Sequence, residues 1–215
     1  MPLQNRVDPF GAIHAAPERG LFMGNRGIIH DPATRTLLRK RWALPAWIIC
    51  ACEFRNVRRE PMGRNRPGGK AGWTELFFLD EVTALAAGHR PCFFCRRERA
   101  TDFVSRFGEA FGIAEPHAPV VDGRLHKERL ASGGRPPAVT AEELAGLADG
   151  TMVADGGTAY ALRDGKALRW SFAGYGGPVP FNRLAERPLR LLTPATSVSV
   201  LGQGYAPVWH PSADT

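Results

Sequence analysis

The four cysteines of this sequence are its best candidates for metal-ligating or reactive side chains. Cys50 and Cys52 stand one residue apart, Cys92 and Cys95 stand two residues apart, and the chain has no other cysteine. The start, Met-Pro-Leu-Gln-Asn-Arg, lacks the basic-then-apolar pattern of an export signal, so we expect a cytoplasmic location. Because disulfides are disfavoured in a reducing compartment, two close cysteine pairs indicate metal ligands.

The two pairs have the spacing of a tetrahedral zinc site. Cys92 and Cys95 form a chelating turn directly before a helical pattern, whose N-terminal amides would stabilise thiolate charge. Cys50 and Cys52 share one face of an expected strand and would complete a closed, structural four-sulfur site. A redox role is disfavoured, because the βαβ pattern that a thioredoxin-like pair needs is missing. Alternatively, Cys52 is a small apolar residue and a histidine is the fourth ligand: His30, His89 or His126.

Short apolar segments surround both pairs and must position them. The residues around Cys50 are apolar and β-branched, which predicts a strand buried on both faces near its middle. Phe103, Phe107 and Phe111 repeat every four residues and predict a helix with these rings in the core. In chain order we expect a strand within 42–54, a basic Gly- and Pro-rich loop over 55–72, a strand over 76–79, a helix over 81–87 that Asp80 caps and Gly88 closes, and a helix over 96–111.

The whole pattern predicts an α+β protein, with a zinc-containing core followed by helices and a small antiparallel β section. Frequent Gly and Pro predict turns and short strands over 1–34, and Thr140 with Glu143 forms a capping box. We divide the chain into a zinc-binding core with the basic segment, 1–135, and a β-rich section, 136–215, although one continuous domain is also possible. The further elements expected are a helix over 120–131, strands over 151–154, 158–163 and 166–172 joined by Gly-containing turns, and a strand over 189–192.

Composition and charge exclude several classes of protein. Of the 215 residues, 44% are hydrophobic and 23% are charged, so the chain can bury a core and global disorder is excluded. The longest mostly apolar stretch, 43–52, is too short to cross a bilayer, so no membrane partner is expected. Residues 35–106 carry a net charge of +8, whereas residues 1–34 and 107–215 carry 0 and −1. This distribution favours a patch that faces a polyanion, although an arginine-rich composition alone would also give basic runs.

A family resemblance lies in residues 75–97, which run from Glu75-Leu-Phe-Phe-Leu-Asp to Arg90-Pro-Cys-Phe-Phe-Cys-Arg-Arg. This stretch resembles the N-terminal zinc domain of the Ada methylphosphotriester-DNA repair protein, in which an Arg-Pro-Cys-x-x-Cys knuckle places two zinc cysteines that map to Cys92 and Cys95. The first pair of that family, one sulfur of which accepts a methyl group from a DNA phosphotriester, corresponds by order to Cys50 and Cys52. The resemblance implies a zinc fold and suggests DNA. Over its whole length, the chain also resembles an uncharacterised group of bacterial proteins.

The first functional hypothesis is a zinc-stabilised nucleic-acid-binding protein, with DNA as the expected partner and a link to DNA repair or damage sensing. Binding to a polyanion should weaken steeply as salt rises, whereas a hydrophobic protein interface should not. Eight basic residues near the cysteines are expected to contact phosphates: Arg58, Arg59, Arg64, Arg66, Lys70, Arg90, Arg96 and Arg97.

Two other hypotheses stay open. One is an enzyme, in which Cys50 is a zinc-activated nucleophile or methyl acceptor; as a hydrolase, Asp122 and His126, four residues apart on a helix, would form an oriented base with Glu128 nearby. The other is an interaction protein whose zinc replaces part of a core. Its partner would bind aromatic residues of the β section: Trp170, Tyr175, Tyr205 and Trp209.

Overall fold

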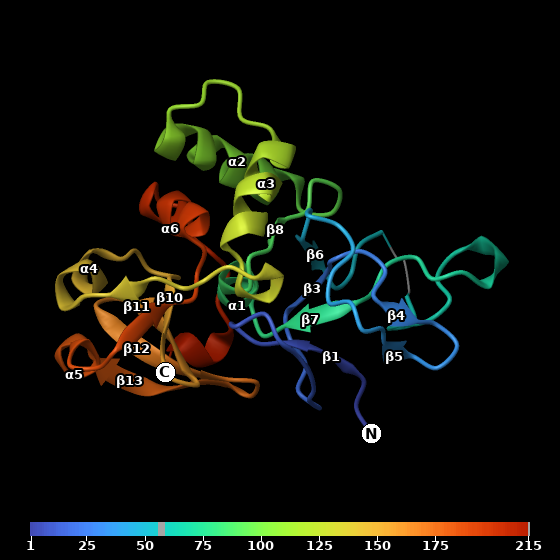
Figure 1. Ribbon diagram of the computed structural model, residues 1–215, viewed down its shortest axis with the longest axis horizontal. Coiled ribbons are helices and arrows are strands. Elements are labelled where there is room, and N and C mark those ends of the chain that lie inside the picture. The colour runs from blue at the N-terminus through green and yellow to red at the C-terminus, as the bar shows by residue number, and fades with distance from the viewer. Residues whose placement is uncertain (56–58, 215) are drawn as a thin grey trace.

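The computed structural model describes residues 1–55 and 59–214 and confirms the α+β class. Two six-stranded sheets lie apart in Figure 1: one on the right, built from residues 4–91, and one at the lower left, built from residues 138–191. Helices pack between and above the two sheets. Within the described ranges, no helix is both long enough and apolar enough to traverse a bilayer.

The N-terminal sheet joins strands that are distant in the sequence. Its order is β2-β1-β7-β3-β6-β8, in which β1–β7 and β6–β8 pair in parallel and the other neighbours pair antiparallel. Parallel neighbours need long crossover connections, so loops and helices lie between them in the chain. The strands are β1 (Gln4–Val7), β2 (Ile13–Ala15), β3 (Phe22–Asn25), β6 (Ile48–Ala51), β7 (Leu76–Phe78) and β8 (Arg90–Pro91), and β4 (His30–Asp31) and β5 (Thr36–Leu37) form a separate hairpin.

The strand and the loop around the first cysteine pair are present, but the strand is shorter than expected. β6 forms within the predicted range 42–54, yet it begins at Ile48 and ends at Ala51, and the chain bends at Cys52. The basic loop over 55–72 is irregular where it is described, apart from the 3₁₀ turn η1 (Pro67–Gly69). A long polar loop therefore follows the first cysteine pair directly.

Helix α1 (Glu81–Ala86) connects β7 to the second cysteine pair. Asp80 caps α1 by accepting a hydrogen bond from the backbone amide of Thr83, and Gly88 follows with a φ of 80°, which favours glycine. Both features were predicted and both are confirmed. After β8 the chain turns through the cysteine pair into α2 (Arg97–Phe111), and α3 (Ala118–Glu128) packs against α2.

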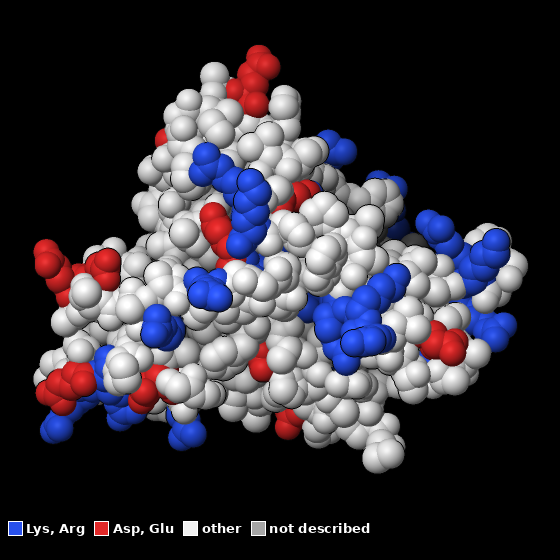
Figure 2. All heavy atoms as spheres, viewed as in Figure 1, with Lys and Arg blue, Asp and Glu red and all other residues white. Residues whose placement is uncertain are grey.

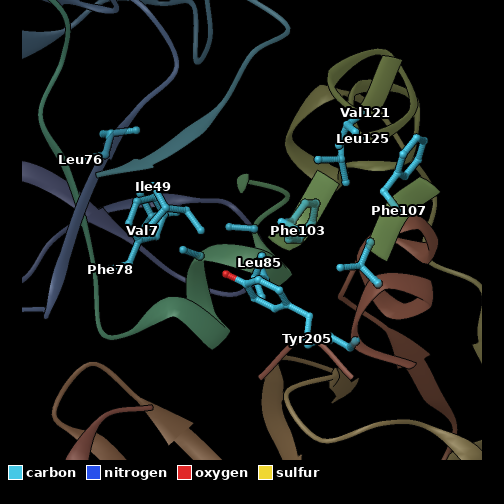
Figure 3. Packing of buried hydrophobic residues seen from close by; sticks show 14 of the residues in the cluster. Val7, Ile49, Leu76, Phe78, Leu85, Phe103, Phe107, Val121, Leu125 and Tyr205 are labelled. Atoms are coloured by element: carbon cyan, nitrogen blue, oxygen red, sulfur yellow. The ribbon is translucent and has the colours of Figure 1, made fainter. Parts of the chain in front are cut away.

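A buried apolar cluster lies between the N-terminal sheet and the helices (Figure 3). Ile49 and Phe78 enter it from the sheet, and Phe103 enters it from α2, as the four-residue repeat predicted. Tyr205 enters it from the C-terminal tail and packs edge-on against Phe103, so the last part of the chain completes this core. Helix α6 (Ala195–Gly202), which leads into this tail, packs on α2 and α3 and was not predicted, because its Thr, Ser and Val residues are weak helix formers.

The C-terminal sheet is built mostly from strands that are neighbours in sequence. Its order is β13-β12-β11-β10-β14-β9, antiparallel throughout, and it confirms the predicted meander. Asp164 and Gly165 both have positive φ in the β11–β12 turn, as a two-residue hairpin requires. The capping box of Thr140 and Glu143 is also present. The elements are β9 (Ala138–Val139), α4 (Ala141–Gly146), β10 (Met152–Asp155), β11 (Thr158–Arg163), β12 (Lys166–Ser171), β13 (Gly174–Pro180), α5 (Phe181–Ala185) and β14 (Leu189–Leu191), with 3₁₀ turns η2 (Leu130–Ser132) and η3 (Pro211–Asp214) on either side.

The aromatic residues that were candidates for a partner surface hold the β section to α1 instead. Trp170, Tyr175 and Tyr205 each donate a hydrogen bond to the start of α1, and Trp209 packs on Tyr175. The acceptors are Thr83 Oγ1, Asp80 Oδ2 and Glu81 Oε1, at 2.9, 2.8 and 2.7 Å. Because these polar atoms and ring faces are used inside the molecule, they do not form the free surface that an interaction protein would need.

Candidate metal centre

Three of the four cysteines converge on one point. The Sγ atoms of Cys50, Cys92 and Cys95 all lie within 4.8 Å of one another. The parallel pairing of β6 with β8 causes this, because its register sets Ile49 beside Pro91 and so brings the next residues of both strands, Cys50 and Cys92, together. Sulfur atoms around a tetrahedral zinc ion, with Zn–S bonds of about 2.3 Å, lie about 3.8 Å apart, so the three thiols fit such an ion.

Backbone amides point at two of the three sulfurs. The amide of Phe94 donates to Cys92 Sγ at 3.3 Å, and the amide of Ala51 donates to Cys95 Sγ at 3.4 Å. An N–H group directed at sulfur stabilises negative charge there, which favours the thiolate that binds a metal. The turn is held in place by the Arg96 amide, which donates to the carbonyl of Cys92. The site therefore offers three positioned sulfur ligands.

Hydrogen bonds among the three thiols shift their pKa values in different directions. Hydrogen bonding to Cys92 and Cys95, together with burial, raises the pKa of Cys50 far above its usual value. The hydrogen bond from Cys50, together with one from Cys95, lowers the pKa of Cys92 strongly. Cys50 alone is therefore a poor nucleophile, and a cation that replaces the thiol protons would be needed to ionise all three sulfurs.

The structure does not bring Cys52 to the other three cysteines. Cys52 is exposed, and its Sγ donates to the carbonyl of Leu21 at 3.4 Å. The expectation that Cys50 and Cys52 share a strand face fails because β6 ends at Ala51, so the alternation of side chains does not continue to Cys52. The closed four-sulfur site is therefore replaced by a three-sulfur centre.

Neither His30 nor His89 joins the three cysteines. His89 is fully buried against Trp47 and accepts a hydrogen bond from Arg26 at 3.3 Å; burial and the nearby arginine charges hold its pKa well below the usual value. His30 Nδ1 lies 2.7 Å from the hydroxyl of Thr74. Within the part of the chain that the structure describes, Cys50, Cys92 and Cys95 are the one group placed to hold a metal ion.

The base of the hydrolase hypothesis is not formed. Asp122 is buried and accepts two hydrogen bonds from the Arg90 guanidinium, at 2.9 and 2.8 Å. His126, the third histidine considered as a metal ligand, instead packs edge-on against Trp42, and its pKa is lowered by burial and by the charge of Arg129. Asp122 therefore forms an ion pair that joins β8 to α3. The hydrolase hypothesis failed here because the sequence did not show that Arg90 lies beside Asp122.

The predicted basic residues divide into paired and free groups. Arg90 and Arg96 are buried and paired, Arg96 with Glu81 at 2.9 Å, so they hold helices in place and do not face a polyanion. Arg59 is half-buried and pairs with Glu75 at 2.7 Å. Arg58 lies outside the described residues. The exposed members of the predicted set are Arg64, Arg66, Lys70 and Arg97.

Lys and Arg side chains gather on one side of the molecule. Figure 2 shows blue spheres over its right-hand part, where Figure 1 places β4, β5 and the η1 loop, with few red spheres among them. On the left, blue and red spheres are intermixed. The charge excess of the sequence segment 35–106 thus corresponds to a surface on the side of the N-terminal sheet.

The three cysteines line a pocket of about 740 Å³. Its wall also holds three cationic side chains, Lys40, Arg59 and Arg66, and no carboxylate among the described residues. Asn25 and Cys52 also line it, and most of the remaining side chains are apolar or aromatic, among them Ile28, Leu44, Trp73 and Phe94. The centre is therefore not sealed in a core but opens into a cavity that suits an anionic ligand with an apolar part.

Sequence reasoning missed the pocket residues outside the predicted loop. Lys40 stands in the run Arg39-Lys40-Arg41, and Trp73 lies directly before the buried Thr74 and Glu75. The cationic run was a usable signal, because three successive basic residues rarely point into a core. Trp73 had no such signal, since only the folded chain places it in the same pocket as the cysteines.

The arrangement offers three thiols for a soft metal ion and a cationic, partly aromatic pocket next to them. No family model, curated protein or solved structure matches this chain. The resemblance to the Ada zinc domain stays a prediction.

Proposed function

We propose that this chain holds a zinc ion through Cys50, Cys92 and Cys95 and binds nucleic acid at the pocket and cationic surface beside that ion. One observation carries the proposal: the three converging cysteines line the wall of a pocket that also holds two exposed cations, Lys40 and Arg66, and no carboxylate among the described residues. A metal centre and an anion-accepting surface therefore belong to one site.

Zinc is the metal that suits these ligands best. Soft thiolates select zinc, copper(I) or iron–sulfur clusters, and zinc prefers four ligands in a tetrahedron. Three protein ligands leave one coordination position, and the pocket lies on the same side as the sulfurs. A reducing, cytoplasmic location belongs to the proposal, because thiols that lie this close to one another would form disulfides in an oxidising compartment.

Nucleic acid, with DNA as the expected form, suits the charges around the pocket. Phosphate-binding proteins place exposed Arg and Lys side chains on one face, where they displace the counterions of the polyanion. The loop that borders the pocket exposes three cationic residues: Arg64, Arg66 and Lys70. Lys40, which precedes β6 in the chain, also lines the pocket. Their number is enough for a salt-sensitive interaction.

The metal is tested by elemental analysis of freshly purified, reduced protein and of four Cys→Ser variants. We expect one zinc per chain in the wild type and in Cys52→Ser, which is the matched control, and none in Cys50→Ser, Cys92→Ser or Cys95→Ser. Absence of metal from the reduced wild type would refute the proposal. Equal loss in Cys52→Ser would restore the four-sulfur site.

Nucleic-acid binding is tested by fluorescence anisotropy with a labelled DNA duplex and its single strand at increasing salt. We expect the affinity to fall linearly on a log–log plot, and the double variant Arg64→Ala/Lys70→Ala to reduce the slope by about 2. Lys166→Ala/Arg169→Ala removes the same charge from exposed positions on β12 and should leave the slope unchanged. No binding at low salt, or an equal effect of both double variants, would refute this half of the proposal.

A second candidate function, a zinc-thiolate methyl acceptor, is favoured by the opening of the centre into the pocket. A zinc ion held by these cysteines would keep their sulfurs ionised; one such sulfur would then attack the methyl carbon of a phosphotriester, the C–O bond would break, and the phosphodiester would leave with the bonding electrons. A closed four-sulfur site would give a substrate no such access. Peptide mapping by mass spectrometry, after exposure to methylated DNA, would detect one added methyl group on Cys50, Cys92 or Cys95.

A further inference from the structure

The turn between the two metal-site cysteines exposes a large aromatic side chain. Phe94 is 70% exposed, whereas its neighbour Phe93 is half-buried against the core. The turn is short, and hydrogen bonds to and from Cys92 fix its backbone. The backbone of Phe94 is therefore held in a position from which its side chain is exposed to solvent. Exposure of a phenylalanine next to a binding site costs solvation free energy, and such residues commonly mark contact surfaces.

The pocket presents further flat groups beside Phe94. The ring of Phe54 packs edge-on against Phe94, with ring centroids 5.1 Å apart, and the guanidinium of Arg55 lies 5.5 Å from the Phe94 centroid. On another part of the wall, the guanidinium of Arg59 lies 4.1 Å from the ring centroid of Trp73. Aromatic rings and guanidinium planes are the surfaces on which unstacked nucleobases stack.

The size and charge of the pocket restrict the ligand further. Its volume of about 740 Å³ lies in the range of small-molecule sites, about 300–1,000 Å³, so it is too small for a duplex and large enough for one nucleotide. Lys40 and Arg66 are exposed on its wall and could pair with the phosphates that flank a base. A nucleobase has two flat faces that stack on aromatic rings, and its flanking phosphates are anionic, so a nucleotide suits a wall that is both aromatic and cationic.

We propose that the pocket takes a single unpaired base of a nucleic-acid strand, stacked on Phe94 beside the three-cysteine centre, while Lys40 and Arg66 hold the adjacent phosphates. This inference rests on the proposed function and specifies its substrate: a single strand, or a duplex from which one base is extruded. A base inside an intact duplex is stacked on both sides and cannot enter the pocket without the cost of unstacking.

The test compares four ligands of equal length in two charge-matched pairs, two duplexes and two single strands, measured by fluorescence anisotropy with the zinc-loaded wild type. The ligands are a perfect duplex, the same duplex with one unpaired base, the single strand, and the single strand with one abasic position at its centre. We expect the unpaired-base duplex and the intact single strand to bind about 10-fold more tightly than the perfect duplex, and the abasic position to weaken binding of the strand.

Phe94→Ala is the decisive variant. It should weaken binding of the intact single strand about 10-fold and leave perfect-duplex binding unchanged. Val120→Ala is the matched control, because Val120 is 45% exposed on α3 and does not line the pocket. Zinc content and circular dichroism of both variants show whether the fold is retained. If Phe94→Ala loses its zinc, Lys40→Ala/Arg66→Ala replaces it and should weaken binding of the duplex with one unpaired base more than binding of the perfect duplex, because only the extruded base brings its flanking phosphates to the pocket.

The outcomes separate this inference from the proposed function. Salt-dependent binding that is equal for all four ligands would overturn the unpaired-base pocket and leave polyanion binding in place. No binding of any ligand would overturn both. Binding of a free nucleoside monophosphate as tightly as the strand would overturn the strand as the occupant. An equal effect of Phe94→Ala and Val120→Ala would overturn the stacking role of Phe94.

Discussion

The two sheets have the same number of strands but opposite construction. The N-terminal sheet pairs β1 with β7 and β6 with β8 in parallel, and the partners in these two pairs lie more than 40 residues apart in the sequence. Most neighbours in the C-terminal sheet follow one another along the chain. The metal-site cysteines and the cationic pocket belong to the first sheet, and its segment 35–106 carries the excess charge.

The difference shows where each sheet obtains its stability. Buried apolar clusters cover both faces of the C-terminal sheet: one consists of C-terminal residues alone, and the other is shared with Leu79, Val82 and Ala86 in and before α1. The edge strand β8, which brings Cys92 to Cys50, is only two residues long, and ion pairs and the thiol centre hold it in position. A site that depends on distant segments therefore needs specific polar or metal contacts, whereas the meander depends on local turns and apolar packing.

Metal removal should have the largest effect and should act on one sheet only. We expect chelation to expose the amides of β6 and β8 to hydrogen exchange, because zinc binding in small zinc domains supplies about 10 kcal/mol or more of folding free energy. The amides of β10, β11 and β12 should keep their protection. Hydrogen exchange followed by mass spectrometry measures both, and Cys92→Ser treated with the same chelator is the control. Equal loss of protection in both sheets would contradict the expectation that the metal stabilises the N-terminal sheet alone.

The buried ion pair that anchors β8 should give the next largest effect. Asp122→Ala leaves the Arg90 charge buried and unpaired, so we expect the free energy of unfolding to fall by about 3–5 kcal/mol. Asp102→Ala breaks the partly exposed pair with Arg106 on α2 and should cost about 0.5 kcal/mol. Urea denaturation measures the free energy of unfolding of both variants. A similar loss in Asp122→Ala and Asp102→Ala would show that the Arg90–Asp122 pair does not anchor β8.

Glu81 links the tail to α2, and its contribution should depend on pH. Burial opposes ionisation of Glu81, but the hydrogen bond and charge of Arg96, with Tyr205, lower its pKa overall. A lowered pKa means that the folded protein binds this proton less tightly than the unfolded chain, so the stability is present above about pH 4.3 and is lost as pH falls further. Glu81→Gln should therefore cost about 2 kcal/mol at pH 7 and progressively less below pH 4.3.

Urea unfolding at pH 7, 5 and 3.5 measures this dependence. Burial raises the pKa of the neighbouring Asp80, so Asp80 changes the stability with pH in the opposite direction to Glu81. The quantity to follow is therefore the difference in free energy of unfolding between the wild type and Glu81→Gln at each pH. Glu98→Gln, at an exposed position in the first turn of α2, is the control. A cost of Glu81→Gln that is the same at all three pH values would exclude the ionised carboxylate as the stabilising form.

The site could be predicted only in part, because its geometry comes from pairing at long range. The spacing of Cys92 and Cys95 is local and predicted a chelating turn, and Asp80 and Gly88 predicted the limits of α1. The approach of Cys50 depends on the parallel pairing of β6 with β8, which no local pattern encodes. The exclusion of Cys52 depends on the end of β6 at Ala51, which tertiary contacts determine.

The side chains that carry the excess charge gather on one side of the molecule, but two of the arginines that were expected to contact phosphates are buried. Arg90 and Arg96 belong to the basic third of the sequence, yet both are buried because their acidic partners lie elsewhere in the chain, Asp122 being 32 residues from Arg90. A buried arginine has the same local sequence as an exposed one, so the pattern could not separate them. In contrast, the C-terminal turns carry their own signal, since Gly165 at positive φ follows directly from the Asp-Gly dipeptide.

The capping box of α4 tests whether the two regions are independent, with the smallest expected effect. Thr140 accepts a hydrogen bond from the Glu143 amide at 3.2 Å, and the Glu143 carboxylate accepts one from the Thr140 amide at 2.8 Å. Thr140→Ala should lower the free energy of unfolding by about 1 kcal/mol, and Thr140→Ser should restore most of it. Because this cap packs only within the C-terminal region, zinc content should not change. If Thr140→Ala also released zinc, the two sheets would be coupled through the helices between them.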